Sequence, residues 1–203
     1  MTFQTRNILL PFPSNIITNE HALEISSWIN TNQSQSIENN PYEFKLLFRG
    51  SKDGFDVKNI FNICDKIVNT VIVLKVEGTG EILGGYNPIK WDNINNEQKN
   101  TQDSFVFSLK TANLKNSILS KVVRNFDHAI YNYPKDSHFS FSNALRLKGN
   151  LKTEKRCYCK ANLSYHMPIR SSEFILPFRP LLSDKYFFSA VECEVFKFSP
   201  RIT

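Results

Sequence analysis

The sequence predicts an α+β, mostly β domain in which two antiparallel sheets pack as a sandwich flanked by a few helices. Three observations indicate this fold class: many short β-branched and aromatic runs, polar loops between them, and only two convincing helical patterns. The chain has 203 residues and 41% hydrophobic content, enough for one large domain with a sizeable core. No internal repeat of about 20 to 50 residues is visible, so a solenoid or propeller is not supported.

The first helix is expected to begin after Thr18, a residue type that caps helix N-termini. Ala22, Ile25 and Ile29 then follow at spacings that place them on one helical face. The polar stretch 30–41, which ends in proline, is expected to be a surface linker. The pattern therefore predicts an amphipathic helix that packs on the core.

The second helix is expected after a short apolar strand at 42–48 and a turn at 50–54. Asp56 is a good N-cap for it. Phe55 stands five positions before Ile60, which is the spacing of a hydrophobic staple across a helix N-terminus.

The remaining elements are expected to be strands, because they are short and rich in β-branched or aromatic residues. The run at 71–76 is apolar enough to be buried on both faces, and the glycine-containing stretch 77–81 that follows is a hairpin loop. The expected strands lie at 71–76, 82–86, 104–109, 118–123, 129–133, 144–148, 157–161 and 187–198.

Two adjacent glycines, Gly84 and Gly85, fall inside one of these strands. Glycines in a strand mark a bulge or the close approach of another group, and we expect the rings of Tyr86 and Trp91 to fill that space. A phosphate-binding loop is the alternative for this glycine-rich hairpin. It is excluded because no Lys-Ser/Thr pair and no capped helix follow.

The positive charge is concentrated in the second half of the chain. The net charge is +6, yet residues 1–100 carry 9 Lys/Arg against 11 Asp/Glu and the other 103 carry 16 against 8. Two interpretations stay open: a solvated hairpin face, or a contact surface for an acidic protein or a phosphate. No nucleic-acid-binding motif accompanies the charge, so no nucleic-acid partner is expected. The densest cluster comprises Lys148, Lys152, Lys155, Arg156 and Lys160.

Location is expected to be cytoplasmic and the chain monomeric. No run of about 18 apolar residues indicates a transmembrane helix, and the N-terminus is a poor secretory signal because Pro11 and Pro13 interrupt it. Four cysteines are too few for a disulfide framework in a chain of this length. We therefore expect reduced thiols.

The cysteines and histidines offer few sites for chemistry. Cys157, Cys159 and His166 suggest a metal site, but Cys-x-Cys lacks the usual knuckle spacing and a second pair. Period-2 spacing places both thiols on one strand face, as core residues or as redox sensors. Cys64 lies on the apolar face of the second helix, where a core role is expected. No metal ligand set and no cofactor is predicted.

No catalytic residue is predicted either. The Gly-x-Ser-x-Gly context of a nucleophile is absent, and none of the four histidines stands in a recognisable catalytic context. Glu81 is the acid of most interest, since it follows a glycine-rich turn. Three roles stay open for it: hydrogen bonding to hairpin amides, a partner-facing surface, or general acid–base work.

Several ordered blocks resemble the TLDc domain family. FKLLFRGSKDGFDVKNIFNICDK, TVIVLKV, GTGEILGGYNPIKW and SFVFSL carry the resemblance, and IITNEHALEISSWI, ILSKVVRNFDHAIYNYP, CYCKANLSYHMPI and ECEVFKF agree with it. It covers residues 14–199, leaving 1–13 as an N-terminal extension and 200–203 as a tail. The chain is most similar to fungal versions of the domain, which are often attached to a BTB domain and are related to oxidation-resistance proteins.

The resemblance implies a two-sheet β-sandwich, resistance to oxidative stress and binding to the vacuolar proton ATPase, with no assigned catalytic reaction. Family-pattern residues, expected to be mainly architectural, are Arg49, Asp53, Gly54, Phe55, Cys64, Asp65, Glu81, Gly84, Gly85, Tyr86 and Trp91. Departures from the family pattern fall in the second half, at 138–147, 164–166 and 174–186. A non-catalytic interaction module is thus the leading hypothesis, and a thiol-based peroxide-responsive protein and an uncharacterised hydrolase are the alternatives.

Overall fold

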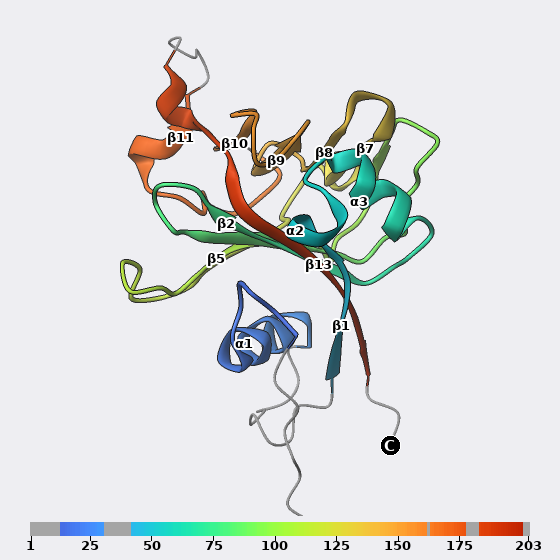
Figure 1. Cartoon of the computed structure of the whole chain (residues 1–203), viewed down its shortest axis with the longest axis horizontal. Coiled ribbons are helices and arrows are strands. Elements are labelled where there is room, and N and C mark those ends of the chain that lie inside the picture. The colour runs from blue at the N-terminus through green and yellow to red at the C-terminus, as the bar shows by residue number, and fades with distance from the viewer. Residues whose placement is uncertain (1–12, 31–41, 162, 178–182, 201–203) are drawn as a thin grey trace, which may run out of the picture.

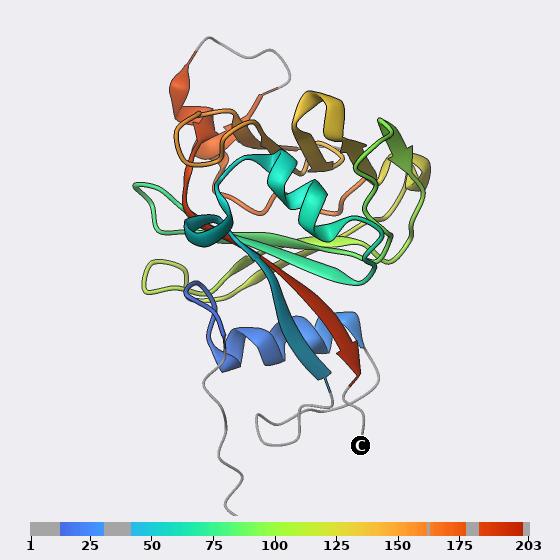
Figure 2. The ribbon, with the colours of Figure 1, turned by 45° about the vertical axis from the view of Figure 1, so that its right-hand side comes forward.

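The computed structural model describes residues 13–30, 42–161, 163–177 and 183–200. Two sheets are layered on each other, and helix α1 (Asn19–Ile29) covers the outer side of the first sheet (Figures 1 and 2). The predicted sandwich with flanking helices is confirmed. The expected linker at 31–41 and most of the N-terminal extension and tail lie outside the described residues.

The first sheet has six strands, all in antiparallel pairs. Its order is β1 (Tyr42–Arg49), β13 (Ala190–Pro200), β2 (Thr70–Val76), β3 (Ile82–Asn87), β5 (Phe105–Leu109) and β6 (Ile118–Lys121). The last long strand of the chain therefore lies between the first two strands of the sheet. Residues from near the two ends of the chain are therefore paired in one sheet.

The second sheet is also antiparallel except for the β10–β11 pair, which is parallel. Its order is β11 (Ile175–Leu176), β10 (Cys157–Lys160), β9 (Leu145–Lys148), β8 (His138–Phe141), β7 (Ile130–Tyr133) and β4 (Glu97–Lys99), with β12 (Phe187–Phe188) also on β10. The other elements are α2 (Gly50–Asp53), α3 (Val57–Cys64) and four 3₁₀ turns: η1 (Phe126–His128), η2 (Pro134–Asp136), η3 (Ser172–Phe174) and η4 (Asp184–Tyr186).

Helix α1 begins where the sequence predicts. The Thr18 hydroxyl accepts a hydrogen bond from the His21 amide at 3.3 Å, and His21 Nδ1 accepts one from the Thr18 amide at 3.4 Å. This reciprocal cap satisfies two amides that the helix leaves unpaired. Ala22 and Ile25 are buried against the first sheet. The helix thus closes one hydrophobic core.

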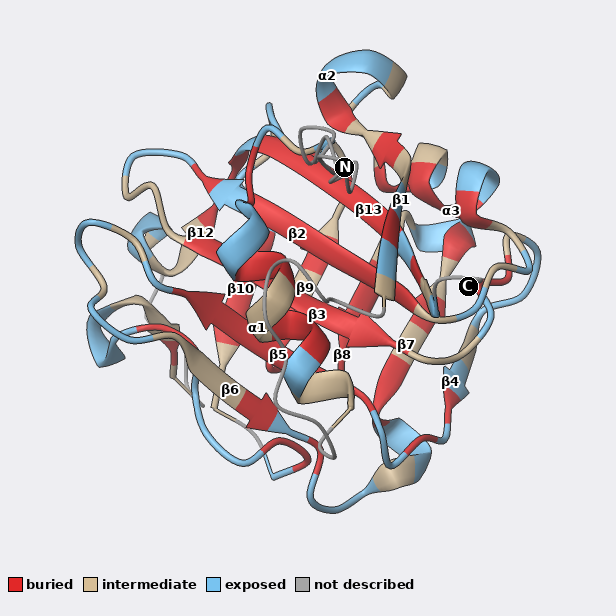
Figure 3. Cartoon of the chain, turned by 90° about the horizontal axis from the view of Figure 1, so that it is seen from below, coloured by how far each residue is buried: buried red, intermediate tan, exposed pale blue. Residues whose placement is uncertain are grey.

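Strand β2 separates two cores. Val71 and Val73 face α1, whereas Ile72, Leu74 and Val76 face the second sheet. Alternate side chains point to opposite faces of a strand, and both faces of this one are covered, as Figure 3 shows for the central strands. The prediction of a strand buried on both faces is confirmed.

The adjacent glycines of β3 make room for two phenylalanine rings, one on each face of the sheet. A Cβ on Gly84 would lie 2.5 Å from Cζ of Phe107, and a Cβ on Gly85 would lie 2.5 Å from Cζ of Phe141. The close approach expected at these glycines is therefore present. The sequence-based prediction that the rings of Tyr86 and Trp91 fill this space is wrong.

Tyr86 and Trp91 are anchored elsewhere. The Trp91 indole is fully buried, stacks on Phe139 with ring centroids 4.2 Å apart, and donates to Thr70 Oγ1 at 2.8 Å. The Tyr86 hydroxyl donates to Asn69 Oδ1 at 3.0 Å, and burial raises its pKa to about 12. Both aromatic residues join loops to strands in the core, which supports an architectural role for them.

Some elements differ from the sequence-based expectation. The loop expected after Trp91 contains strand β4, whose three polar and charged residues pair only with β7. Strand β8 was not expected, and the turn at 50–54 includes the single helical turn α2. The expected last strand is divided at Ser189 into β12 and β13, which pair in different sheets. No helix among the described residues is long and apolar enough to cross a membrane.

Candidate interaction surface

The family-pattern residues at the end of β1 form a connected structural corner. Arg49 Nε donates to Glu194 Oε1 at 2.7 Å, and its amide donates to Asp53 Oδ2 at 2.9 Å. Gly54 ends α2 with φ +86°, a conformation that favours glycine. The ring of Phe55 packs against the core between the sheets. These contacts support the interpretation of this group as framework.

Glu81 is held by one side chain from a distant part of the chain and by one from its own hairpin. Arg170 Nε lies 3.1 and 3.2 Å from its two carboxylate oxygens, and Arg170 Nη2 donates to Oε2 at 2.5 Å. The Thr79 hydroxyl donates to the same oxygen at 2.7 Å. The carboxylate is thus engaged by two side chains, and no hairpin amide is among its described hydrogen-bond partners.

The five basic residues of the C-terminal cluster lie on several elements. Lys148 and Lys160 project from the outer face of the second sheet, whereas the Lys152 ammonium lies 5.1 Å from the ring centroid of Phe55. Lys155 lines a pocket beside β12, whereas Arg156 pairs with Glu154 at 2.9 Å and acts on Lys148, whose pKa it lowers.

The outer face of the second sheet gathers aromatic and basic side chains. Inward residues of these strands, such as Phe139, Leu147 and Cys159, belong to the core, so the residues that alternate with them point outward. Strands β7, β8, β9 and β10 lie side by side. We call the outward set the aromatic–basic face: Tyr131, Tyr133, His138, Arg146, Lys148 and Tyr158.

The rings of this face are in mutual contact. The centroids of Tyr131 and Tyr133 are 5.9 Å apart, and that of His138 lies 5.4 Å from Tyr133. The guanidinium of Arg146 lies 5.1 Å from the ring centroid of Tyr158 and donates to its hydroxyl at 3.4 Å. A cation within about 6 Å of a ring centroid is attracted to the ring, and the hydrogen bond adds a second contact to the same tyrosine. The face is therefore preorganised.

The two cations of this face, Arg146 and Lys148, form no ion pair among the described residues, and the nearest acid that acts on them is Asp136, which raises the pKa of Lys148. Within the described chain, Arg146 Nε is buried without a hydrogen-bond partner. Burial, and then repulsion by Arg146 and Arg156, lowers the pKa of Lys148. An acidic ligand would relieve this repulsion.

The same positive charges also act on His138. Burial, and then Arg146 and Lys148, lowers its pKa from 6.5 to about 4. The unfolded chain therefore binds this proton at a higher pH than the folded chain, so stability falls as the pH drops from about 6.5 to 4. We expect His138→Gln to spare about 1–2 kcal/mol of the stability that the wild type loses between pH 7 and pH 4, after allowance for partial exposure.

Urea denaturation of both proteins at the two pH values measures this difference. His166→Gln, at an exposed histidine, is the matched control and should leave the difference at its wild-type value. An imidazole midpoint near 6.5 for His138 in an NMR titration of the folded protein would contradict the prediction.

All four cysteines are free thiols in the core. Each is at most 1% exposed, and burial raises the pKa of Cys64, Cys157 and Cys159 to about 12 and that of Cys193 well above its usual value. His166 is exposed, so the structure does not bring it together with the thiols. Among the described residues no group of three or more His, Cys, Asp or Glu side chains is placed to hold a metal ion.

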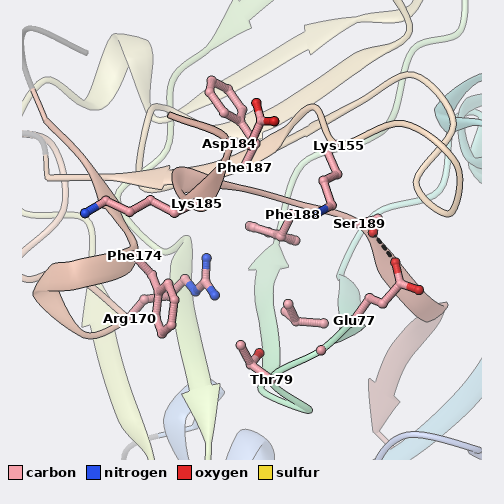
Figure 4. A pocket seen from close by; sticks show the side chains of 12 residues that line it. Glu77, Thr79, Lys155, Arg170, Phe174, Asp184, Lys185, Phe187, Phe188 and Ser189 are labelled. Carbon is pink, nitrogen blue, oxygen red and sulfur yellow. Dashed lines mark hydrogen bonds between the residues drawn. The ribbon is translucent and has the colours of Figure 1, made fainter. Parts of the chain in front are cut away.

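A pocket of about 240 Å³ lies where the β2–β3 hairpin meets the segment around β12 (Figure 4). Its described lining contains no histidine, so the acid–histidine pair required by the hydrolase hypothesis is not found there. The lining residues are Val76, Glu77, Gly78, Thr79, Lys155, Arg170, Phe174, Asp184, Lys185, Phe187, Phe188 and Ser189.

Two packed sheets, with a helix over one outer face and aromatic and basic side chains on the other, define the chain as a β-sandwich protein. The model of the TLDc domain family matches residues 10–199, nearly the whole chain. The chain therefore belongs to the TLDc domain family. A comparison with curated proteins finds no match.

Sequence reasoning missed most of the aromatic–basic face and the role of Arg170. The signal for the face was available, because the segments 130–133, 138–141, 145–148 and 157–160 all alternate with period 2. What the pattern lacked was the order of the strands in the sheet. Arg170 has no such signal, since its segment belongs to no strand.

Proposed function

We propose that this chain is a non-catalytic interaction module that binds an acidic surface of a protein partner through the aromatic–basic face. Its proposed partner is a subunit of the vacuolar proton ATPase, and its proposed role is in resistance to oxidative stress. TLDc domains are protein-interaction modules, and the family is associated with that resistance. The ATPase as partner, a cytoplasmic location and a kinship with fungal oxidation-resistance proteins are parts of the proposal.

One observation carries the proposal: two cations, Arg146 and Lys148, stand among aromatic rings and form no ion pair within the described chain. Arginine and tyrosine are enriched among the residues that dominate binding energy at interfaces. Complementary charge also steers a partner to the surface and raises the rate of association. The negative charge of a carboxylate-rich segment would complement the positive charge of this face.

The geometry weighs against a thiol mechanism. A reactive cysteine needs an exposed thiolate with a lowered pKa, whereas burial raises the pKa of every thiol in this chain. Oxidative-stress resistance is therefore better explained by contact with another protein than by cysteine chemistry.

The double variant Arg146→Gln, Lys148→Gln tests the proposal. We expect it to bind purified peripheral-stalk subunits of the proton ATPase about tenfold more weakly than the wild type, since it removes both unpaired cations. Binding of the wild type should also weaken between about 50 and 500 mM salt, because salt screens exposed charges. Surface plasmon resonance measures both effects.

The matched control is Lys45→Gln, Lys58→Gln, which makes the same change in net charge at exposed positions outside the face. It should bind as the wild type does. Equal weakening in both double variants would show that total charge, and not this face, determines affinity. If the wild type captures no ATPase subunit at either salt concentration, the proposed partner is wrong.

A further inference from the structure

Arg170 combines deep burial with an unused donor. Its side chain is 2% exposed, and its Nη1 atom has no hydrogen-bond partner. A buried donor without a partner costs free energy, so such atoms are rare in folded proteins. Arg170 also lines the pocket beside β12. The missing acceptor is thus expected inside that pocket.

The guanidinium is fixed in position by its other contacts. Nε and Nη2 bind Glu81, and the rings of Phe174 and Phe188 lie with their centroids 4.7 and 5.0 Å from Cζ. Figure 4 shows the guanidinium between these rings with nitrogen atoms directed into the pocket. A ligand oxygen would therefore meet a donor that is already oriented, which lowers the entropy cost of binding.

Two exposed cations stand at the pocket beside the buried guanidinium of Arg170. Lys155 and Lys185 are exposed cations in its lining, and of the two lining acids, Glu77 already accepts a hydrogen bond from Ser189 Oγ at 2.5 Å. The other acid is Asp184. With Glu81 paired to the arginine, the two lysines balance the two lining acids, so the pocket carries no net charge. We expect weak binding, with a dissociation constant of about 1 mM.

We propose that this pocket binds a small oxyanion, a phosphate or a carboxylate, whose oxygen accepts from Nη1 of Arg170 while Lys155 and Lys185 neutralise its charge. A volume of about 240 Å³ with phenylalanine walls also accommodates a compact apolar group attached to the anion. The site shares no residue with the aromatic–basic face and does not depend on the function proposed for it.

NMR titration of the full chain tests the site. Inorganic phosphate, phenyl phosphate and acetate are added separately at constant ionic strength, with sodium chloride as the reference. The expected result is a saturable shift of the Arg170 side-chain N–H signals and of the Thr79 and Ser189 amides with at least one oxyanion. Response to phosphate or to acetate distinguishes the two chemistries.

Three variants make the test specific. Arg170→Lys keeps a cation beside Glu81 but removes Nη1, so saturable binding should be lost. Lys155→Ala removes only an exposed charge and should weaken binding about threefold. Lys58→Ala, an exposed lysine on α3, should leave it unchanged.

The proposal is overturned if no oxyanion shifts the Arg170 signals saturably, or if chloride shifts them equally. It is also overturned if Lys155→Ala and Lys58→Ala give the same affinity as the wild type. Should Arg170→Lys fail to fold, the wild-type Arg170 signals and the two exposed-lysine variants still decide the outcome.

Discussion

Replacing Gly84 by alanine is expected to destabilise the fold by at least about 3 kcal/mol. The added Cβ would meet the backbone carbonyl oxygen of Ile72 as well as the Phe107 ring. The carbonyl belongs to the neighbouring strand β2 and pairs within the central sheet, so it cannot move aside without loss of strand pairing. Overpacking against rigid backbone is among the largest effects of a single substitution. Urea denaturation of the variant measures the loss.

The neighbouring glycine provides a sharper comparison. A Cβ on Gly85 would meet the Phe141 ring at 2.5 Å and the carbonyl oxygen of Phe105 at 2.9 Å, so its main obstacle is a side chain. We expect Phe141→Leu to recover part of the stability lost in Gly85→Ala, because leucine lacks the outer ring atoms. Phe107→Leu should not rescue Gly84→Ala in the same way.

Gly78→Ala is the control for the cost of losing a glycine itself. Nothing lies within 4 Å of its Cβ position, and its φ of +81° is left-handed. Only conformational strain of about 1 kcal/mol is expected there. If Gly84→Ala costs no more than Gly78→Ala, then close packing is not the reason for the glycine in β3.

The parts of the fold that the sequence predicts well are those set by local pattern. The Thr18 cap and the spacing of Ala22 and Ile25 define α1 within one short segment, and the run 71–76 indicates a buried strand by composition alone. Local pattern does not predict strand β4. Its residues are polar, and it is a strand only because the edge of β7 offers hydrogen bonds to it.

The contacts that build the sites join residues far apart in the chain. Glu81 and Arg170 are 89 positions apart, and Arg49 and Glu194 are 145 apart. Periodicity shows which side chains share a strand face, but it does not show which strands are neighbours. For a related reason, adjacency along the sequence did not show that the lysines between β9 and β10 have different contacts: Lys152 lies over the ring of Phe55, whereas Lys155 lines the pocket beside β12.

Arg49→Met is expected to destabilise the chain by about 3 kcal/mol. The Glu194 carboxylate is completely buried, and Arg49 is its cationic partner at 2.7 Å. Removing one member of a buried ion pair leaves the other charge uncompensated in the interior. The expected loss lies at the low end for such pairs, because Glu194 keeps hydrogen bonds from the Ser14 hydroxyl at 2.5 Å and the Asn15 amide at 3.0 Å.

A double-mutant cycle with Glu194→Gln separates the charge from the packing. Glutamine is neutral and nearly isosteric, so the pair Arg49→Met, Glu194→Gln no longer contains an unpaired buried charge. We expect it to be about 2 kcal/mol more stable than the sum of the two single losses predicts. Additive losses would show that Arg49 stabilises the corner through contacts other than the one with the Glu194 charge.

The Arg49→Met variant also tests how α1 is attached to the sheet. Glu194 lies on β13, whereas Ser14 and Asn15 belong to the segment that leads into α1, and Arg49 Nη2 also donates to the Pro13 carbonyl at 2.7 Å. One buried carboxylate therefore ties this segment to β1 and β13. In Arg49→Met we expect the α1 amides to exchange with solvent faster than in the wild type by a larger factor than the amides of β2. Local opening is governed by the contacts that an element loses first, so equal acceleration in both elements would place the effect in global stability and not in this tie.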